Sequence, residues 1–178
     1  MEGQVIWITG LSGSGKTTVS NALLKRLKKR HYHPILLDGD NLRNLITNVS
    51  DVNETYTREA RITLSKRYSQ LCKLLSSQGF TVIIATVSMF AEIYKWNRSN
   101  LPNYFEVYLD VPLKELRRRD PKNLYEKFYS GAIKNVAGLD LKIDKPDEPN
   151  LIVNFTPGQN PDEIVNIIIR KLELDKVV

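Results

Sequence analysis

The sequence predicts an α/β fold, a three-layer sandwich in which helices flank a central and mainly parallel β-sheet. Apolar runs of strand length alternate along the chain with longer amphipathic stretches, which is the pattern of repeated strand–helix units. A glycine-rich turn joins the first of these strands to the first helix. The length of 178 residues, of which 42% are hydrophobic and 26% charged, is typical of one folded domain, so we assign 1–178 to a single domain.

The N-terminal elements follow from the spacing of their apolar residues. A buried strand is predicted at 5–9, and the helix at 16–29 carries its apolar residues on one face. A short strand at 35–37 and a short helix at 40–46 come next. The polar stretch 48–56 is predicted to be a surface loop that could move over a ligand.

The middle of the chain contains a long helix and two central strands. The helix is predicted at 57–78, and Gly79 ends it. The runs 80–85 and 104–109 are nearly continuous in apolar and β-branched residues, as strands buried on both faces are. A further helix is predicted between these strands, at 89–96.

Prolines delimit the elements that follow. Pro112 stands where the first turn of a helix tolerates proline, and the helix at 113–119 ends before Pro121. A second short basic helix is predicted at 124–130. Few periodic apolar residues occur at 132–150, so this stretch is predicted to be a long ordered loop or a lid, and the lid is placed at approximately 122–150.

The chain then returns to the sheet and ends on a helix. A last strand is predicted at 151–154. Asn160 provides a cap for the helix that follows, Pro161 stands at its first position, and Glu163 comes three residues after the cap.

The composition excludes several classes of protein. No apolar run approaches the ~20 residues that span a bilayer, and residues 1–4 lack the basic start of a signal peptide, so we expect a cytoplasmic protein without a membrane partner. Cys72 is the only cysteine, which excludes an intrachain disulfide. The net charge of +6 favours an anionic partner. The basic clusters at 25–30 and 117–119 have no interleaved aromatic residues, so no nucleic-acid partner is expected.

The most specific motif is the sequence GLSGSGKTT at 10–18, which fits G-x-x-x-x-G-K-[ST] between a strand and a helix. Its glycines allow successive backbone N–H groups to surround a phosphate, Lys16 reaches the terminal phosphates, and the Thr17 hydroxyl binds Mg²⁺. Thr18 contacts phosphate or packs within the helix. We therefore predict a P-loop NTPase or kinase fold that uses ATP and Mg²⁺, with nucleotide contacts from Gly10, Ser12, Gly13, Ser14, Gly15, Lys16, Thr17 and Thr18.

Among P-loop proteins, the sequence favours a small-molecule kinase. It has no N-K-x-D guanine signature, and its length leaves no room for the additional modules of motors and helicases. Asp110, at the end of a predicted strand, could hold Mg²⁺ as in ATPases, although a helix begins directly after it, which favours a structural or indirect role. The alternative class is a regulatory module that binds ATP without transferring phosphate.

Two carboxylates and an arginine follow the second predicted strand. Asp38, Asp40 and Arg43 stand at the carboxyl edge of the sheet, where ligands collect and where the P-loop also lies. A carboxylate can orient an acceptor hydroxyl or take its proton, and an arginine can bind an anionic acceptor. Asp40 is the predicted catalytic carboxylate, together with Lys16. The structural alternative is that the aspartate caps a helix and the arginine is solvated. A regulatory module that does not transfer phosphate would not need a carboxylate at this position.

Four segments resemble the adenylyl-sulfate (APS) kinase family: GLSGSGKTT, LLDGDNLR, FEVYLDVP and RDPKNLYEKFYSGAIKNVAGLD. The resemblance runs from about Gln4 to the C-terminus. It implies a kinase that uses Mg·ATP to phosphorylate the ribose 3′-hydroxyl of a small nucleotide acceptor. Because members of the family often form dimers, it also implies a homodimer.

The resemblance also implies roles for residues on the acceptor side. It places Asp40 at the acceptor hydroxyl, Arg43 and Arg61 at the phosphate side of the acceptor, and Lys127 as a basic group from the lid. Tyr56 falls where the family has a phenylalanine that stacks on the acceptor base.

Two further positions carry over from the family. Arg119 would lie near the ATP adenine. Ser88 aligns with an active-site serine, with capping of the following helix as the alternative.

The departures from the family pattern all lie on the acceptor side. Leu64 replaces an asparagine, Ala91 replaces an arginine, and Val136 replaces a second stacking phenylalanine. About four extra residues separate Arg43 from Tyr56 by comparison with the family pattern. Loss of stacking area and of polar contacts favours an acceptor other than APS.

One branch of the family, the cytidine diphosphoramidate kinases of capsular polysaccharide modification, resembles this chain at 88–90 and 96–98. A pyrimidine needs less stacking surface than adenine, which agrees with Val136. The expected acceptor is therefore cytidine 5′-diphosphoramidate, with APS as the alternative.

Overall fold

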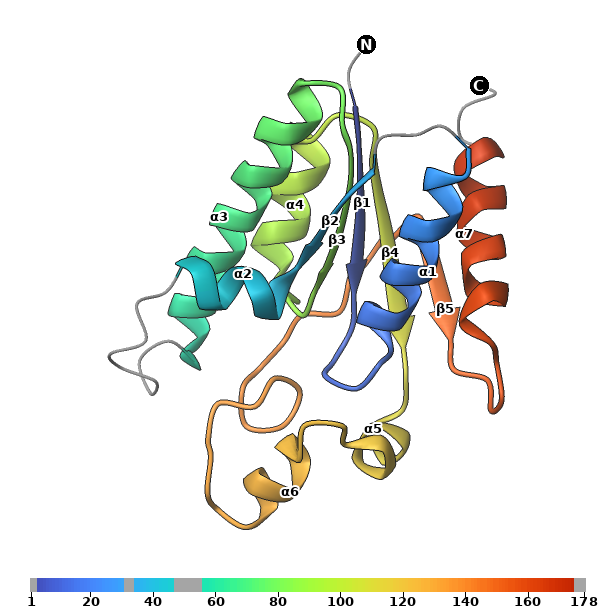
Figure 1. Cartoon of the computed structure of the whole chain (residues 1–178). Helices are drawn as coiled ribbons and strands as arrows, with labels where there is room; N and C mark the ends of the chain where they lie inside the picture. The colour runs from blue at the N-terminus through green and yellow to red at the C-terminus, as the bar shows by residue number, and fades with distance from the viewer. Residues whose placement is uncertain (1–2, 31–33, 47–55, 175–178) are drawn as a thin grey trace.

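The structure is a computed structural model that describes residues 3–30, 34–46 and 56–174. In these ranges five strands form one parallel sheet in the order β2-β3-β1-β4-β5. Helices cover both faces of the sheet (Figure 1), so the predicted three-layer α/β sandwich is confirmed. The strands are β1 (Gln4–Thr9), β2 (Pro34–Asp38), β3 (Thr81–Thr86), β4 (Tyr104–Asp110) and β5 (Leu151–Asn154).

Two layers of helices enclose the sheet. The first and last helices, α1 and α7, cover one face, and α3 and α4 cover the other (Figure 1). Successive side chains of β1 enter the two layers in turn, so that Ile6 packs beneath one and Trp7 beneath the other. None of the helices in the described ranges is long and apolar enough to cross a membrane. The helices are α1 (Lys16–Lys28), α2 (Gly39–Ile46), α3 (Arg58–Ser77), α4 (Ala91–Asn100), α5 (Leu113–Arg119), α6 (Leu124–Tyr129) and α7 (Pro161–Leu174).

Local sequence signals explain where two of the long helices begin. The Thr57 side chain accepts a hydrogen bond from the Ala60 N–H at 3.2 Å and so caps α3. The Asn160 side chain accepts from the Asp162 N–H at 2.9 Å, which confirms the predicted cap of α7.

The helix predicted at 89–96 instead begins at Ala91 and continues to Asn100. Phe90 has an extended backbone, with φ −137° and ψ 128°, and both Met89 and Phe90 are buried. The two apolar residues resemble the start of a helix face in sequence, but burial holds them in the connection between β3 and α4.

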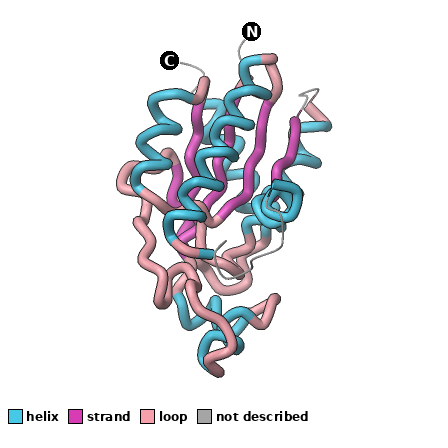
Figure 2. Tube along the Cα trace, turned by 90° about the vertical axis from the view of Figure 1, so that its left-hand side faces the viewer, coloured by secondary structure: helices cyan, strands magenta, loops and turns pink. Residues whose placement is uncertain are grey.

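The segments beyond the carboxyl ends of the strands include α5 and α6, and the chain after α6 returns from there along the sheet to β5 (Figures 1 and 2). The predicted lid, 122–150, contains α6 and, among its remaining residues, an isolated bridge between Ala137 and Leu141. Its movement as a lid stays a prediction. Most of the surface loop predicted at 48–56 lies outside the described residues, which resume at Tyr56.

Candidate active site

The P-loop joins β1 to α1, and its backbone favours glycine at three positions, Gly10, Gly13 and Gly15, which all have a positive φ. Gly10 lies so close to the end of β4 that a Cβ atom would stand 2.8 Å from the Leu109 carbonyl oxygen and 2.7 Å from the Ser14 hydroxyl. Gly15 caps α1 in the left-handed conformation, with φ 93°. These positions create the turn from which the N-terminus of α1 faces the end of the sheet.

Lys16 is the first residue of α1 and lies under the P-loop. Its ammonium group donates a hydrogen bond to the Leu11 carbonyl oxygen at 2.8 Å. Burial lowers the pKa of Lys16 to about 8, against the attraction of Asp40 and Asp38. A bound phosphate would favour the protonated form further, so this lysine is suited to an anionic ligand.

Asp38 ends β2 beside the P-loop. Its carboxylate accepts a hydrogen bond from the Thr17 hydroxyl at 3.0 Å and another from the Asp40 N–H at 3.0 Å. The carboxylate therefore supports the start of α2 and faces the residue predicted to bind Mg²⁺. The Thr17 hydroxyl and the Asp38 carboxylate are oxygen donors of the kind that Mg²⁺ prefers, so the residues present fit this ion.

Asp40 forms an ion pair with Lys122, from the turn between α5 and α6. The Asp40 side chain is 66% exposed in the presence of this lysine, so it is accessible to an acceptor. Lys127, the lid lysine expected at the site, is exposed and does not line the cavity described below. Sequence reasoning missed Lys122, although it stands in the same RDPKNLY segment, directly after the proline that ends α5.

A cavity of about 750 Å³ extends from the P-loop to the segment after α6. It brings together residues that were predicted to bind ATP or the acceptor. These residues come from six separate parts of the chain. The predicted residues that line it are Ser12, Gly13, Gly15, Lys16, Thr17, Thr18, Asp38, Asp40, Arg43, Tyr56, Arg61, Ser88, Arg119 and Val136.

Two arginines contact Tyr56 on one side of this cavity. The guanidinium carbons of Arg43 and Arg61 lie 4.8 Å and 5.1 Å from the centre of the Tyr56 ring. Arg61 also donates hydrogen bonds to the carbonyl oxygens of Tyr56 at 3.1 Å and Asn135 at 3.0 Å. Burial lowers the pKa of Arg61 to about 10, and the neighbouring Arg43 cation acts in the same direction. The arrangement concentrates positive charge where the acceptor phosphates are expected.

Ser88 lies on the floor of the cavity and is buried. Its hydroxyl is 2.8 Å from the Thr86 hydroxyl and 2.7 Å from the Ser65 hydroxyl. The N-terminus of α4 has no side-chain cap from its own cap residue, Phe90, and Ser88 makes no such bond. The capping alternative for Ser88 is therefore wrong, and its hydroxyl belongs to a buried polar chain that joins β3 to α3.

A second cavity, of about 160 Å³, adjoins the other side of the P-loop. Ser14, Thr18 and Arg119 line it together with Phe155, which follows β5. The Arg119 guanidinium donates to the Gly13 carbonyl oxygen at 3.3 Å and lies 5.1 Å from the centre of the Phe155 ring. A guanidinium and an aromatic ring are both groups on which a nucleobase can stack, so this cavity suits a nucleobase. Phe155 was not singled out from the sequence, because only the fold brings the end of β5 next to α5.

Asp110 does not join the phosphate site. Its carboxylate accepts a hydrogen bond from the Tyr108 hydroxyl at 2.8 Å and pairs with the Lys145 ammonium at 3.3 Å. These contacts support the structural role over the metal-binding one.

A family model described as "Adenylylsulphate kinase" matches residues 2–154. The chain belongs to the adenylylsulphate kinase family. The resemblance inferred from the P-loop and from the RDPKNLY segment is thereby confirmed, and so is the assignment as a phosphotransferase.

Individual members of the family are similar over nearly the whole chain. A cytidine diphosphoramidate kinase from Campylobacter jejuni is 43% identical over 170 residues, which cover 96% of each protein. An adenylyl-sulfate kinase from Pseudomonas aeruginosa is 39% identical, over 97% of this chain and 86% of that protein. The structure of the Mycobacterium tuberculosis APS kinase in complex with AMPPNP and APS superposes with a TM-score of 0.84 at 33% identity, covering 97% of this chain and 98% of that one.

Two of the three departures from the family pattern lie in the main cavity. Leu64 and Val136 both line it and are both almost completely buried. Ala91 is the exposed first residue of α4 and does not line it. The acceptor end of the cavity is thus apolar at positions where the family pattern has an amide and an aromatic ring.

Proposed function

We propose that the protein transfers the γ-phosphoryl group of ATP to the ribose 3′-hydroxyl of a cytidine nucleotide, cytidine 5′-diphosphoramidate. The observation that carries the choice of acceptor is the apolar wall formed by Leu64 and Val136. These side chains offer no hydrogen bonds to the polar edge of a purine and less stacking area than phenylalanine, whereas a smaller pyrimidine leaves fewer polar groups unmatched. The 43% identity to a cytidine diphosphoramidate kinase supports the same choice.

The ATP site of the proposal uses the P-loop and the second cavity. Backbone N–H groups of the loop and the Lys16 ammonium bind the phosphates, and the second cavity, which Arg119 and Phe155 line, accepts the adenine. The Thr17 hydroxyl and the Asp38 carboxylate would hold Mg²⁺, directly or through water, and the ion would supply charge stabilisation to the phosphoryl group. The position of Asp38 beside Thr17 favours this role over the acceptor contact expected from the sequence.

The acceptor site of the proposal is centred on Asp40. Its carboxylate orients the acceptor hydroxyl and takes its proton, while Lys16 stabilises the charge on the transferred group. Lys122 holds the Asp40 carboxylate in place through their ion pair. Arg43 and Arg61 bind the diphosphate side of the acceptor.

APS is the second candidate acceptor. The adenylyl-sulfate kinase relatives and the APS-bound structural neighbour favour it, because their similarity extends over nearly the whole chain. A homodimer is also part of the proposal, and light scattering of the purified protein tests it.

The decisive experiment compares kcat/KM for cytidine 5′-diphosphoramidate, CDP and APS at saturating Mg·ATP, with mass spectrometry to locate the new phosphate. If each of the missing family contacts weakens APS binding by ~1 kcal/mol, the cytidine nucleotide should be preferred by at least ~10-fold. A preference for APS would show that the protein is an APS kinase and would contradict the proposed acceptor. ATP binding without phosphate transfer to any nucleotide would support the alternative that the protein is a regulatory module.

A further inference from the structure

Phe90 forms part of the wall of the main cavity, and residues distant in sequence hold it there. The Asp144 N–H donates to the Met89 carbonyl oxygen at 2.9 Å. The Asp144 carboxylate accepts from the Ala91 N–H at 3.1 Å. One residue therefore bonds to both chain neighbours of Phe90, although 53 positions separate it from the nearer of the two in sequence.

Arg58 completes this arrangement from the first residue of α3. Its guanidinium donates to the same carboxylate oxygen of Asp144 at 2.9 Å. The guanidinium carbon also lies 5.2 Å from the centre of the Phe90 ring. Neither Arg58 nor Asp144 lines the cavity, whereas Phe90 does.

We infer that Arg58 and Asp144 are positioning residues for the acceptor, because they fix Phe90 against the apolar end of the cavity. This inference rests on the proposed function, since it assumes that the nucleotide acceptor occupies that end. The N-terminus of α4 has no cap from Phe90 itself, so the Asp144 carboxylate supplies the bond that its first N–H needs. Small displacements of a substrate-positioning group have large kinetic effects. Loss of the Arg58 and Asp144 contacts should therefore raise the KM of the acceptor and leave the KM of ATP unchanged.

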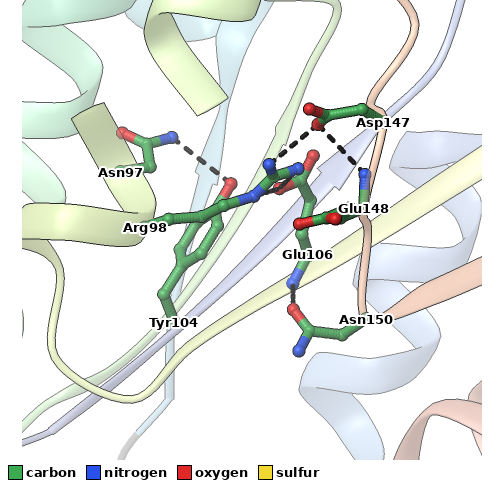
Figure 3. Close-up of polar contacts among 7 residues, drawn as sticks. All are labelled: Asn97, Arg98, Tyr104, Glu106, Asp147, Glu148 and Asn150. Carbon is green, nitrogen blue, oxygen red and sulfur yellow. Dashed lines mark hydrogen bonds and ion pairs between the residues drawn. The ribbon is translucent and has the colours of Figure 1, made fainter. Parts of the chain in front are cut away.

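The structure also provides a matched control. Asp147 lies three residues further along the same segment and pairs with Arg98, near the other end of α4, at 2.8 Å (Figure 3). Neither of these residues lines the main cavity. Asp144→Ala and Asp147→Ala thus make the same chemical change in the same segment, and each breaks an ion pair with an arginine of the α3–α4 layer.

The experiment measures kcat and the KM values of both substrates for the wild type and these variants, with the thermal midpoint as a measure of stability. Asp144→Ala should raise the acceptor KM about tenfold and leave the KM of ATP within about twofold. Asp147→Ala should leave both KM values within about twofold of the wild type. This should hold even if its thermal midpoint falls by as much as that of Asp144→Ala. Asp144→Asn keeps an oxygen for the Ala91 N–H and should recover part of the loss.

Two results would overturn the inference. Equal acceptor KM values in the two alanine variants would show that Asp144 has no special effect, while the proposed function would stand. Parallel rises in the KM of acceptor and ATP would indicate general loosening. If Asp144→Ala fails to fold, Arg58→Met decides the matter by the same criterion, because it retains the apolar stem and removes the ion pair. Failure of the proposed function is seen separately, in a wild type that transfers phosphate to none of the nucleotides.

Discussion

Glu106 should make the stability of the protein depend on pH. It lies in the middle of β4, its side chain is completely buried, and its carboxylate pairs with Arg98 at 3.1 Å (Figure 3). Burial raises the pKa of Glu106 to about 7 from its ordinary value of 4.5, although Arg98 opposes the shift. The folded protein therefore binds a proton that the unfolded chain releases between these two pH values.

The sign and size of the effect follow from this difference. The stabilisation from the protonated carboxyl is complete below about pH 4.5, the ordinary value, and is lost as the pH rises through about 7. The difference between the two pKa values corresponds to about 3 kcal/mol of unfolding free energy. Glu106→Gln, which stays uncharged throughout, should remove this part of the pH dependence.

Urea denaturation at pH 5 and pH 8 measures the effect. The wild type should lose about 2 to 3 kcal/mol more unfolding free energy than Glu106→Gln between these two conditions, somewhat less than the full difference because pH 5 lies within the titration range and not below it. Other titrating groups are common to both proteins, so their contributions cancel in the comparison. Glu148→Gln, the same change at an exposed neighbour of the cluster, should retain the wild-type dependence. An unchanged pH dependence in Glu106→Gln would refute the reasoning, because it would mean that the buried carboxyl titrates as it does in water.

The remaining predictions concern the transfer reaction. Lys16→Ala and Asp40→Asn should each lower kcat by at least ~100-fold in a coupled ADP-release assay. The first change removes charge stabilisation, and the second removes the group that positions the hydroxyl. A wild-type rate in a folded Asp40→Asn protein would show that Asp40 has no part in the mechanism. Arg43→Ala and Arg61→Ala should raise the acceptor KM and leave ATP affinity, measured by titration calorimetry, nearly unchanged, whereas equal weakening of ATP binding would contradict the division of the cavity. Lys122→Met should lower kcat about tenfold, with Lys127→Met as the control that retains activity; equal effects of the two changes would show that the ion pair with Asp40 has no part in catalysis.

The parts of the site that the sequence predicted are those whose chemistry is local. The glycines, Lys16 and Thr17 lie within one motif, and the backbone of a strand–turn–helix unit fixes their relative positions. The cap of α7 was predictable for the same reason, because Asn160 and Asp162 are two residues apart. Neighbouring residues determine these features, so their sequence alone is sufficient to identify them.

The parts that the sequence missed depend on contacts between distant segments. Lys122 and Lys127 are both lysines of the predicted lid, and only the path of the chain after α5 decides which one reaches Asp40. The pair of apolar residues before α4 resembled a helix start because nothing nearby shows that Asp144 would bond on both sides of Phe90. Packing between segments overrides local propensity at such positions.

The phosphate-binding part and the acceptor end of the main cavity are built in different ways. ATP phosphates are bound by backbone groups of one continuous loop, and this solution is preserved in the motif itself. In the proposed function, the acceptor is bound by side chains that α2, α3, β3 and the segment after α6 each bring to the cavity. Single substitutions such as Leu64 and Val136 can therefore change the acceptor end without disturbing the P-loop. A kinase of this architecture can keep its phosphoryl donor while its acceptor changes, because different segments of the chain bind the two substrates.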